Sequence, residues 1–408
     1  MTDQEAILLR PTRGSSLPHI LLVIAQLFFL TSSPFRGRRE LAIGTLTFLA
    51  IWAGISPWTH DPGAANFAAL AWPHWLSTIE KFLNSMPSPE VAVWPVDKAA
   101  GIAVTYNAFG WQKLKWAVSL ILNLRGIRYN TQVKNVPPAR FTSKQQHGKV
   151  KFLLWQAVEL AYCMFMGDLV AQLSIALFFT PAPTNSMLLN AYDADWRLSF
   201  LKALVFGSGP YFFINMQYVL ASMVCVAIGV SKPEDWPPLF GRLRTATTVR
   251  AFWGKFWHQM IRRPLTGLTD RILAMLRIPH GTTASSYASL WLAFAISGFM
   301  HAASLTLMPC PADVEEWARW RGLLAHFMWQ AAAITFEDFV IYIWRRKVGS
   351  SAPPAAARVI GYVWVIWSFW TSLPMAADVL LKLRMGAESP FPVTFWGPFV
   401  QKFVHAGG

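Results

Sequence analysis

The feature that most constrains this chain is a series of apolar runs, most of them long enough to cross a lipid bilayer. The runs are bounded by charged residues or by proline and glycine, and they cover residues 17–30, 41–58, 152–180, 198–230, 287–308, 323–344 and 360–383. A bilayer core about 30 Å thick needs about 20 mostly apolar residues per helix. The sequence therefore predicts an all-α, polytopic integral membrane helical bundle with about seven to nine transmembrane helices.

Composition and the weaker apolar pieces agree with one membrane domain over residues 1–408. Charged residues make up only 14% of the chain, whereas a soluble domain has about 25%. Prolines break residues 59–112 into short pieces, which we expect to be interfacial or re-entrant helices. The run 198–230 is long enough for two pieces, broken around Gly207-Ser208-Gly209-Pro210. The sequence contains no internal repeat of the kind that many secondary transporters carry.

Basic residues gather in two polar stretches between the apolar runs. Residues 113–151 carry nine lysines and arginines and no acidic residue, and residues 232–283 are also strongly basic. One interpretation is that both are cytoplasmic loops that follow the positive-inside rule. The other is a docking surface for a phosphorylated substrate, because Arg and Lys pair with phosphate oxygens. No nucleic-acid partner is expected, since no nucleic-acid-binding module is present.

The stretch from Phe252 to Pro264 combines aromatic and polar residues at helical spacing. Wound as an α-helix, it places its aromatic residues, Met260 and Ile261 on one stripe. The opposite stripe holds Lys255, His258, Gln259 and Arg262. Because proline ends helices, we expect Pro264 to stop this one. The stretch predicts a helix that presents an imidazole, an amide and basic groups in one row, or an interfacial helix in which His258 is incidental.

A second polar group lies inside the apolar run 287–308. Ser297, His301 and Ser304 share one helical face, and Gly298 and Ala302 allow a neighbouring helix to approach closely. Titratable side chains at membrane depth are costly and usually face a cavity or a partner. His301 is therefore a candidate general base near neutral pH, or a structural histidine bonded to a carbonyl or a serine.

Acidic residues inside the apolar runs form a third group. His326, Gln330 and Glu337 are predicted to share a face, and Glu337 is placed to pair with Arg345. Asp168, with Gln172 one turn later, is a further intramembrane carboxylate. For both acids we favour hydrogen bonds between helices over direct catalysis. The three cysteines show no disulfide or zinc spacing, so no metal site is predicted.

These motifs resemble a known family. Phe252-Trp253-Gly254-Lys255-Phe256-Trp257-His258-Gln259, followed by Ser297-Gly298-Phe299-Met300-His301, resembles the wax synthase-like branch of the membrane-bound O-acyltransferase superfamily. The stretch from Gln330 to Arg346 and, more weakly, Arg125-Gly126-Ile127-Arg128 also resemble it. Together they cover about residues 120–350, which we take as the core of the single domain. In length and composition the chain is most similar to fungal members that acetylate terpenoid and meroterpenoid alcohols.

The resemblance implies a multi-pass protein of the endoplasmic reticulum whose helices enclose a reaction chamber. Acyl-CoA, here acetyl-CoA as co-substrate with no bound cofactor, would enter from the cytosolic side, and a lipophilic alcohol from the bilayer. The resemblance makes His301 the catalytic base and places His258 where many members carry Asn. Substrate or CoA contacts are expected from Trp257, Gln259, Lys255, Arg262, Arg263, Ser297, Gln330 and Glu337.

This chemistry fits the residue types. An alcohol needs a base within hydrogen-bond reach to attack a thioester, and the developing oxyanion needs a donor, which His258, Gln259 or a backbone N–H supplies. Two other functions stay open. One is a long-chain wax-ester or sterol-type acyltransferase; the other is a secondary transporter of a lipophilic metabolite, which Asp168 and Glu337 would support. A prenyltransferase is disfavoured because its paired-aspartate motifs are missing from the sequence.

We predict that His258→Asn retains more acyl transfer than His258→Ala. The amide of Asn can donate a hydrogen bond to the thioester carbonyl, and the methyl group of Ala cannot. The measurement is the rate of CoA release by the two purified variants. Equal rates would show that the side chain at this position is not a carbonyl donor.

Overall fold

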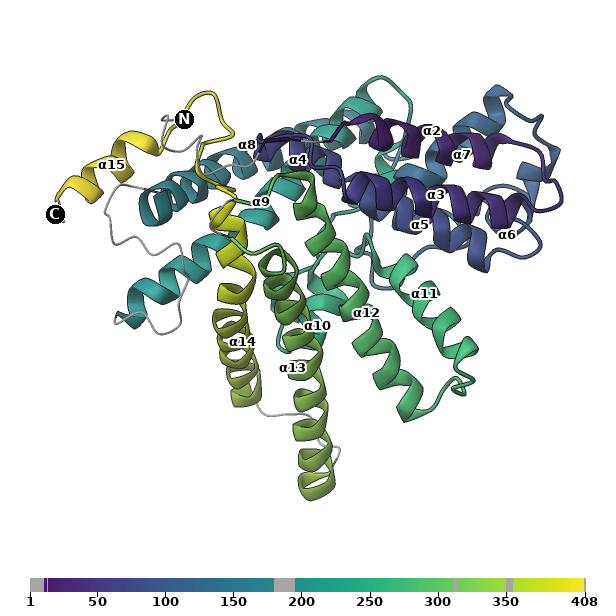
Figure 1. The fold of residues 1–408 in the computed structure, drawn as a ribbon. Helices are drawn as coiled ribbons and strands as arrows, with labels where there is room; N and C mark the ends of the chain where they lie inside the picture. The colour runs from purple at the N-terminus through teal and green to yellow at the C-terminus, as the bar shows by residue number, and fades with distance from the viewer. Residues whose placement is uncertain (1–10, 13, 180–194, 312–313, 350–354, 407–408) are drawn as a thin grey trace. The chain divides into compact units, whose positions relative to one another are not determined.

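The computed structural model describes residues 11–12, 14–179, 195–311, 314–349 and 355–406. Within these ranges the chain is helical and contains no strand, the only β-type pairing being a single bridge between Pro95 and Tyr129 (Figure 1). The chain divides into two compact units, each built from two separate stretches. The first unit comprises Met1–Lys134 and Gln259–Ala331, and the second comprises Asn135–His258 and Ala332–Gly408.

The first unit is a bundle of short and medium helices. Its helices are α2 (Leu17–Thr31), α3 (Arg38–Gly54), α4 (Pro62–Ala69), α5 (Ala71–Asn84), α6 (Pro89–Ala92), α7 (Trp111–Leu122), α11 (Arg262–Met275), α12 (Thr283–Ser304) and the first part of α13 (Ala318–Val348). Phe29 and Leu30 of α2, Phe82 of α5 and Trp116 of α7 form a buried cluster. Single 3-10 turns lie at Ile102–Thr105 and Leu305–Leu307.

A buried ion triad ties three helices of this unit together. Glu90 of α6 is 0% exposed, and its carboxylate pairs with Arg38 of α3 at 2.7 Å and with Lys113 of α7 at 3.0 Å. Burial raises the pKa of this carboxyl, but the hydrogen bonds and charge of Arg38 and the bond from Lys113 outweigh burial and lower the pKa to about 2. Glu90 is therefore ionised at neutral pH, and its single negative charge is shared by two cations that are themselves shielded from water.

The second unit is built around two long helices that pack along each other. These are α8 (Gly148–Ser174), which ends in a π turn at Ile175–Phe179, and α9 (Trp196–Ala227). Gln156 of α8 donates a hydrogen bond to Ser222 of α9 at 2.6 Å. The unit also contains α10 (Val249–Ala251), a π turn at Phe252–Phe256, the rest of α13, α14 (Ala355–Lys382), α15 (Gly397–Ala406) and 3-10 turns at Pro233–Asp235 and Leu243–Thr245.

Each predicted apolar run forms a helix in the structure. Among the described residues, four helical segments are long and apolar enough to cross a membrane: Gly148–Phe179, Trp196–Ala227, Thr283–Leu307 and Ala356–Lys382. Of the other runs, α2 has 15 residues and α3 has 17, and α13 has 31 but includes several charges. The predicted end of one run at residue 180 lies outside the described residues. The total of about seven to nine transmembrane helices stays a prediction.

The expected break inside the run 198–230 is wrong. Helix α9 continues through Pro210, which lies in its interior. Proline removes one backbone hydrogen bond, and long apolar helices tolerate this loss when neighbouring groups and packing compensate. Val205 and Phe212, on either side of Pro210, pack into a buried cluster with Val170 of α8. The contact with α8 on both sides of the proline is consistent with an unbroken helix.

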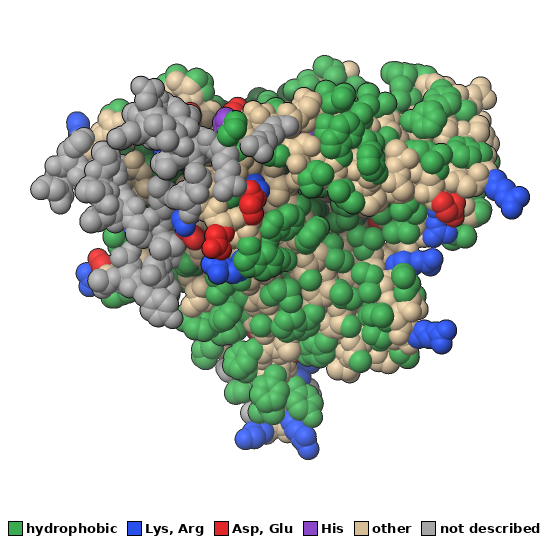
Figure 2. Space-filling view, in the orientation of Figure 1, with side chains coloured by type: hydrophobic (Ala, Val, Ile, Leu, Met, Phe, Trp, Pro, Cys, Tyr) green, Lys and Arg blue, Asp and Glu red, His purple; other side chains and the backbone are tan. Residues whose placement is uncertain are grey.

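Apolar side chains remain on the outside of the long helices. Only 22–44% of the most apolar window in each of the four segments is buried inside the protein. Leu154 and Val158 of α8 are 65% and 66% exposed, and Ile360 of α14 is 68% exposed. Figure 2 shows such side chains over much of the visible face. Exposed apolar surface of this extent marks contact with another apolar phase, here a membrane.

We predict that Glu90→Gln lowers the free energy of unfolding by about 3–5 kcal/mol, because it leaves two buried cations without their counter-charge. The control is Asp97→Asn, which breaks the exposed Arg128–Asp97 pair of the same unit and should cost less than about 1 kcal/mol. Unfolding curves of the purified variants in detergent at neutral pH measure both changes. Equal midpoints would contradict the stabilising role of the triad.

Candidate functional site

His301 lies near the end of α12, in the first unit. Its Nδ1 atom is 2.7 Å from the backbone carbonyl oxygen of Ser297, one turn earlier. A carbonyl oxygen can only accept, so Nδ1 must carry a proton. In the neutral imidazole, Nε2 then carries the lone pair. The ring lies against Phe327 of α13, with ring centroids 4.7 Å apart. The helix itself thus fixes both the tautomer and the orientation that a base requires.

The residues between Ser297 and Ser304 allow the predicted close approach of another helix. Ala302 is 0% exposed. A Cβ atom added to Gly298 would lie 3.1 Å from Cβ of Phe327 and 3.4 Å from Cα of Leu324 on α13. Ser304 donates a hydrogen bond to the carbonyl oxygen of His301 at 2.6 Å. The small side chain at position 298 therefore lets Phe327 reach the imidazole.

The expected amphipathic helix over residues 252–263 is wrong. The chain forms one π turn at Phe252–Phe256 and becomes extended at Trp257, with φ −66° and ψ 152°. Pro264 does not stop a helix but lies in the first turn of α11, where its missing N–H costs no helical hydrogen bond. The polar residues of the stretch consequently do not share one helical face.

Aromatic contacts surround His258 in the second unit. Phe240 lies 5.9 Å from the His258 ring and 5.1 Å from Trp257, measured between ring centroids. Trp257 stacks on Phe252 at 5.5 Å, and Gly241 donates a backbone hydrogen bond to Phe256 at 2.7 Å. Lys255 is exposed. The His258 ring thus lies against two aromatic side chains, Phe240 and Trp257.

The residues that follow His258 belong to the first unit and contact their own neighbours. Arg262 donates to Oε1 of Gln259 at 2.9 Å, and Gln259 is buried. Arg263 pairs with Glu80 of α5 at 3.1 Å. Lys81, beside Glu80, is also buried: burial lowers the pKa of its ammonium to about 8, with Glu80 raising it and Arg263 lowering it. The expected role of Arg262 and Arg263 in phosphate binding stays a prediction.

The predicted pairing of Glu337 with Arg345 is wrong. The Glu337 carboxylate instead accepts hydrogen bonds from the backbone N–H groups of Val249 and Arg250 and from the indole of Trp364 at 2.8 Å. Arg250 also pairs with Asp338. Glu337 therefore fixes the start of α10 and the π turn that follows it, and Arg345 is exposed.

The remaining predicted polar residues are buried. Gln330 and His326 of α13 are 0% and 6% exposed. Asp168 accepts from the N–H groups of Phe395 and Trp396 at 2.7 and 2.9 Å, and also from Gln172 and the Thr394 hydroxyl. Asp168 thereby joins α8 to the segment that precedes α15. The structure accounts for Asp168 and Glu337 as residues that hold the chain together.

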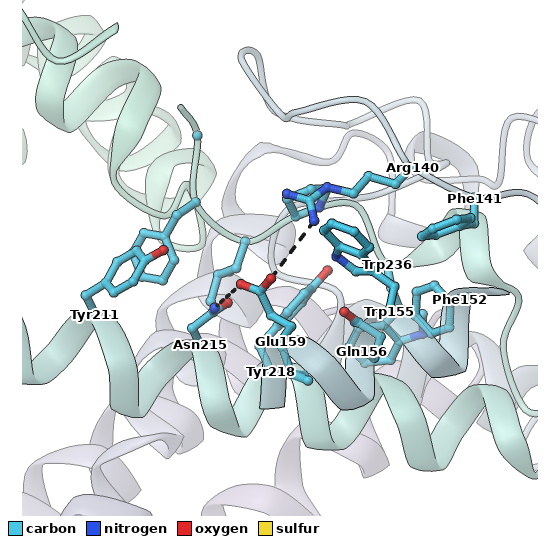
Figure 3. A pocket seen from close by; sticks show the side chains of 15 residues that line it. Arg140, Phe141, Phe152, Trp155, Gln156, Glu159, Tyr211, Asn215, Tyr218 and Trp236 are labelled. Atoms are coloured by element: carbon cyan, nitrogen blue, oxygen red, sulfur yellow. Dashed lines mark hydrogen bonds and ion pairs between the residues drawn. The ribbon is translucent and has the colours of Figure 1, made fainter. Parts of the chain in front are cut away.

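Sequence reasoning missed one feature of the second unit, a cavity of about 100 Å³. Arg140, Glu159 and Asn215 line it together with a ring of aromatic side chains (Figure 3). The lining residues come from four separate stretches of the chain and form no motif. The basic stretch 113–151 contains Arg140, and this was the one signal in the sequence that pointed to the region.

Comparison with known proteins connects these observations. The model of the membrane bound O-acyl transferase family matches residues 236–329, which include His258 and His301. The model of the aspirochlorine biosynthesis protein F C-terminal domain matches residues 148–227, the segment of α8 and α9. Aspirochlorine biosynthesis protein F of Aspergillus oryzae is 49% identical over 234 residues, covering 55% of this chain and 89% of that protein.

Relatives named acetyltransferases align over a larger share of the chain. Acetyltransferase ataH of Aspergillus terreus is 28% identical over 308 residues, covering 70% of this chain and 96% of the relative. Acetyltransferase eriL of Hericium erinaceus is 28% identical over 286 residues, covering 70% and 71%. The chain belongs to the membrane-bound O-acyltransferases of fungal secondary metabolism. The resemblance stated from the motifs is thereby confirmed.

We predict that Gly298→Val slows transfer by this acyltransferase and destabilises it by about 1–3 kcal/mol, because overpacking pushes Phe327 against His301. Gly44→Val is the matched control, since Gly44 also lies in a helix of the first unit but has no neighbour within 4 Å of an added Cβ. The measurements are the thermal midpoint and the rate of CoA release. The prediction fails if both variants keep the wild-type rate.

Proposed function

We propose that this acyltransferase moves the acetyl group of acetyl-CoA to a hydroxyl of a lipophilic terpenoid or meroterpenoid alcohol. Relatives named acetyltransferases support the acyl group, and the apolar exterior supports an acceptor that arrives through the bilayer. The observation that carries the proposal is His301, with Nδ1 bonded to the carbonyl oxygen of Ser297 and its other nitrogen left to act as base. We expect the protein to be multi-pass and to reside in the endoplasmic reticulum.

The reaction proceeds by direct attack of the alcohol on the thioester. Nε2 of His301 takes the hydroxyl proton while the alcohol oxygen bonds to the thioester carbon. The tetrahedral intermediate then collapses, the carbon–sulfur bond breaks, and the leaving CoA sulfur receives the proton from the imidazolium. The products are the acetate ester and CoA, and every proton and electron pair is accounted for without a further reactant.

Stabilisation of the oxyanion is assigned to donors from the matched family segment. We propose that His258, with Gln259 next to it, donates to the carbonyl oxygen as negative charge develops there. Trp257, Ser297, Gln330 and Glu337 would then shape the surroundings, and Lys255, Arg262 and Arg263 would attract the phosphates of CoA. We propose that residues 1–408 act as one functional domain, as the sequence predicts.

An acyl-enzyme is not needed, because a thiolate is already a good leaving group. The buried cysteines also have structural contacts. Cys163 accepts a hydrogen bond from Asn215 at 3.3 Å, and Cys310 donates to the carbonyl oxygen of Val314 at 3.2 Å. Direct transfer is the simplest route that these residues support.

We predict that His301→Ala lowers the transfer rate by about 10²–10⁴-fold, the usual cost of losing a general base. The fold should persist, because within the described part of the chain the polar contact of this side chain lies in its own helix. The measurement is CoA release, followed by liquid chromatography, from acetyl-CoA and farnesol as a probe alcohol.

The matched control is His74→Ala. His74 is a second half-buried histidine of the same unit, with Nδ1 also 2.7 Å from a backbone carbonyl oxygen, that of Ile121. This variant should keep the wild-type rate. Near-full turnover by a folded His301→Ala protein would exclude His301 as the base.

A further inference from the structure

Exposed apolar and basic side chains meet in the second unit, at the end where α13 finishes and α14 begins. Glu337 of α13 accepts a hydrogen bond from the Trp364 indole of α14 at 2.8 Å, and the ring of Phe336 lies 5.4 Å from that of Trp364. Helices α13 and α14 run in opposite directions past this contact (Figure 1). Residues that follow Glu337 and residues that precede Trp364 therefore lie towards the same end of the helix pair.

Four exposed basic side chains form a cluster at this end, the basic end cluster: Arg345, Arg346 and Lys347 on α13 and Arg358 on α14. At the α-helical rise, Arg345 lies about 12 Å beyond Glu337 and Arg358 about 9 Å before Trp364, so the cations of the two helices reach a similar height. The sequence has no acidic residue between positions 339 and 377. Within the described residues, the ion pairs of the second unit belong to other cations. The cluster thus carries positive charge that the protein itself does not balance.

An exposed apolar or aromatic side chain lies one helical turn before each basic residue of α13: Ile341 precedes Arg345, Tyr342 precedes Arg346, and Trp344 precedes Lys347. Arg346 also donates a hydrogen bond to the Tyr342 hydroxyl at 3.2 Å. Tyr and Trp are enriched where hydrocarbon meets headgroups, and long basic side chains lay their stems on apolar surface and extend their charge into the polar layer. Figure 2 shows basic side chains at the lower end of the view, next to apolar ones.

Helix α14 shows the same order of side chains. Val359, Ile360 and Val363 are exposed and follow Arg358 directly. They belong to Ala356–Lys382, a segment long and apolar enough to cross a membrane. On both helices an apolar band therefore leads into positive charge, which is the order of layers that a phospholipid presents in reverse, with its acyl chains followed by its phosphate.

We propose that the basic end cluster binds the headgroup of an anionic phospholipid. The phosphodiester oxygen atoms accept hydrogen bonds from the guanidinium groups, and the acyl chains lie along the exposed apolar side chains of α13 and α14. A lipid is the partner because the cluster is continuous with the apolar band, which a soluble anion would leave uncovered. Groups of four or more basic residues beside a membrane helix attract anionic lipids in this way. The inference concerns a surface outside the predicted reaction residues and does not depend on the proposed acetyl transfer.

Native mass spectrometry of the purified full-length protein measures the binding, after incubation in detergent with equal amounts of palmitoyl-oleoyl phosphatidylserine and phosphatidylcholine. The wild-type protein should retain phosphatidylserine in preference to phosphatidylcholine. Arg345→Gln combined with Arg346→Gln should lower the ratio of the two bound lipids about tenfold or more, since each basic residue near an anionic surface contributes about a fivefold attraction. Arg345→Lys combined with Arg346→Lys should keep most of the preference, because both charges remain.

A charge-matched control lies in the same unit. Arg242 and Arg244, at the 3-10 turn Leu243–Thr245, are also exposed, and Arg242→Gln combined with Arg244→Gln removes the same two charges. This variant should keep the wild-type ratio. Arg358→Gln alone tests the contribution of α14 and should lower the ratio about fivefold. All variants should keep the wild-type thermal midpoint, because the substituted side chains are exposed.

Three results would overturn the proposal. One is an unchanged lipid ratio in the Arg345 and Arg346 glutamine variant. Another is an equal loss in the Arg242 and Arg244 control, because the net charge of the protein rather than the cluster would then attract the lipid. The third is a wild-type ratio that does not fall in about 0.5 M sodium chloride, since salt at that level screens charge pairs that face water. None of these measurements depends on CoA release, so the proposed function is tested separately.

Discussion

The architecture of this protein depends on one requirement. Every backbone N–H and C=O group away from water needs a hydrogen-bond partner within the protein, because lipid offers none. Long helices supply these partners through their own backbone hydrogen bonds. At two places outside helix interiors, a buried carboxylate accepts hydrogen bonds from backbone N–H groups instead. Glu337 accepts from the N–H groups of Val249 and Arg250, and Asp168 from those of Phe395 and Trp396. Both acids thus hold the backbone, so His301 remains the stronger candidate for proton transfer.

Much of the fold could be predicted from the sequence because hydropathy and helical spacing are local properties. The apolar runs became helices, and the four-residue spacing of Ser297 and His301 placed a backbone carbonyl beside the imidazole. Gly298 likewise allowed the close helix contact that its size predicted. Such features depend on residues one or two turns apart, so no knowledge of the tertiary structure was required.

The error at residues 252–264 has a tertiary cause. The spacing of aromatic and polar residues there fits an α-helix, but the loop at Gly241 takes the backbone carbonyl of Phe256. A Cβ on Gly241 would lie 2.1 Å from the carbonyl oxygen of Lys255, so the two segments pack backbone to backbone. The aromatic residues then pack against one another and against Phe240 instead of forming a stripe. Contacts with residues distant in sequence determine the conformation of this segment, and hydrophobic periodicity carries no information about such contacts.

Dependence on tertiary packing also explains why the sequence did not predict the cavity of the second unit. Arg140, Glu159 and Asn215 are each ordinary in their own stretch and meet only when α8 packs along α9. A base bonded to a carbonyl oxygen gains a fixed tautomer without a second charge nearby. Such a base accelerates transfer only if the thioester is held within reach, since proximity supplies much of the rate. Donor contacts far from the thioester then contribute to catalysis by positioning it.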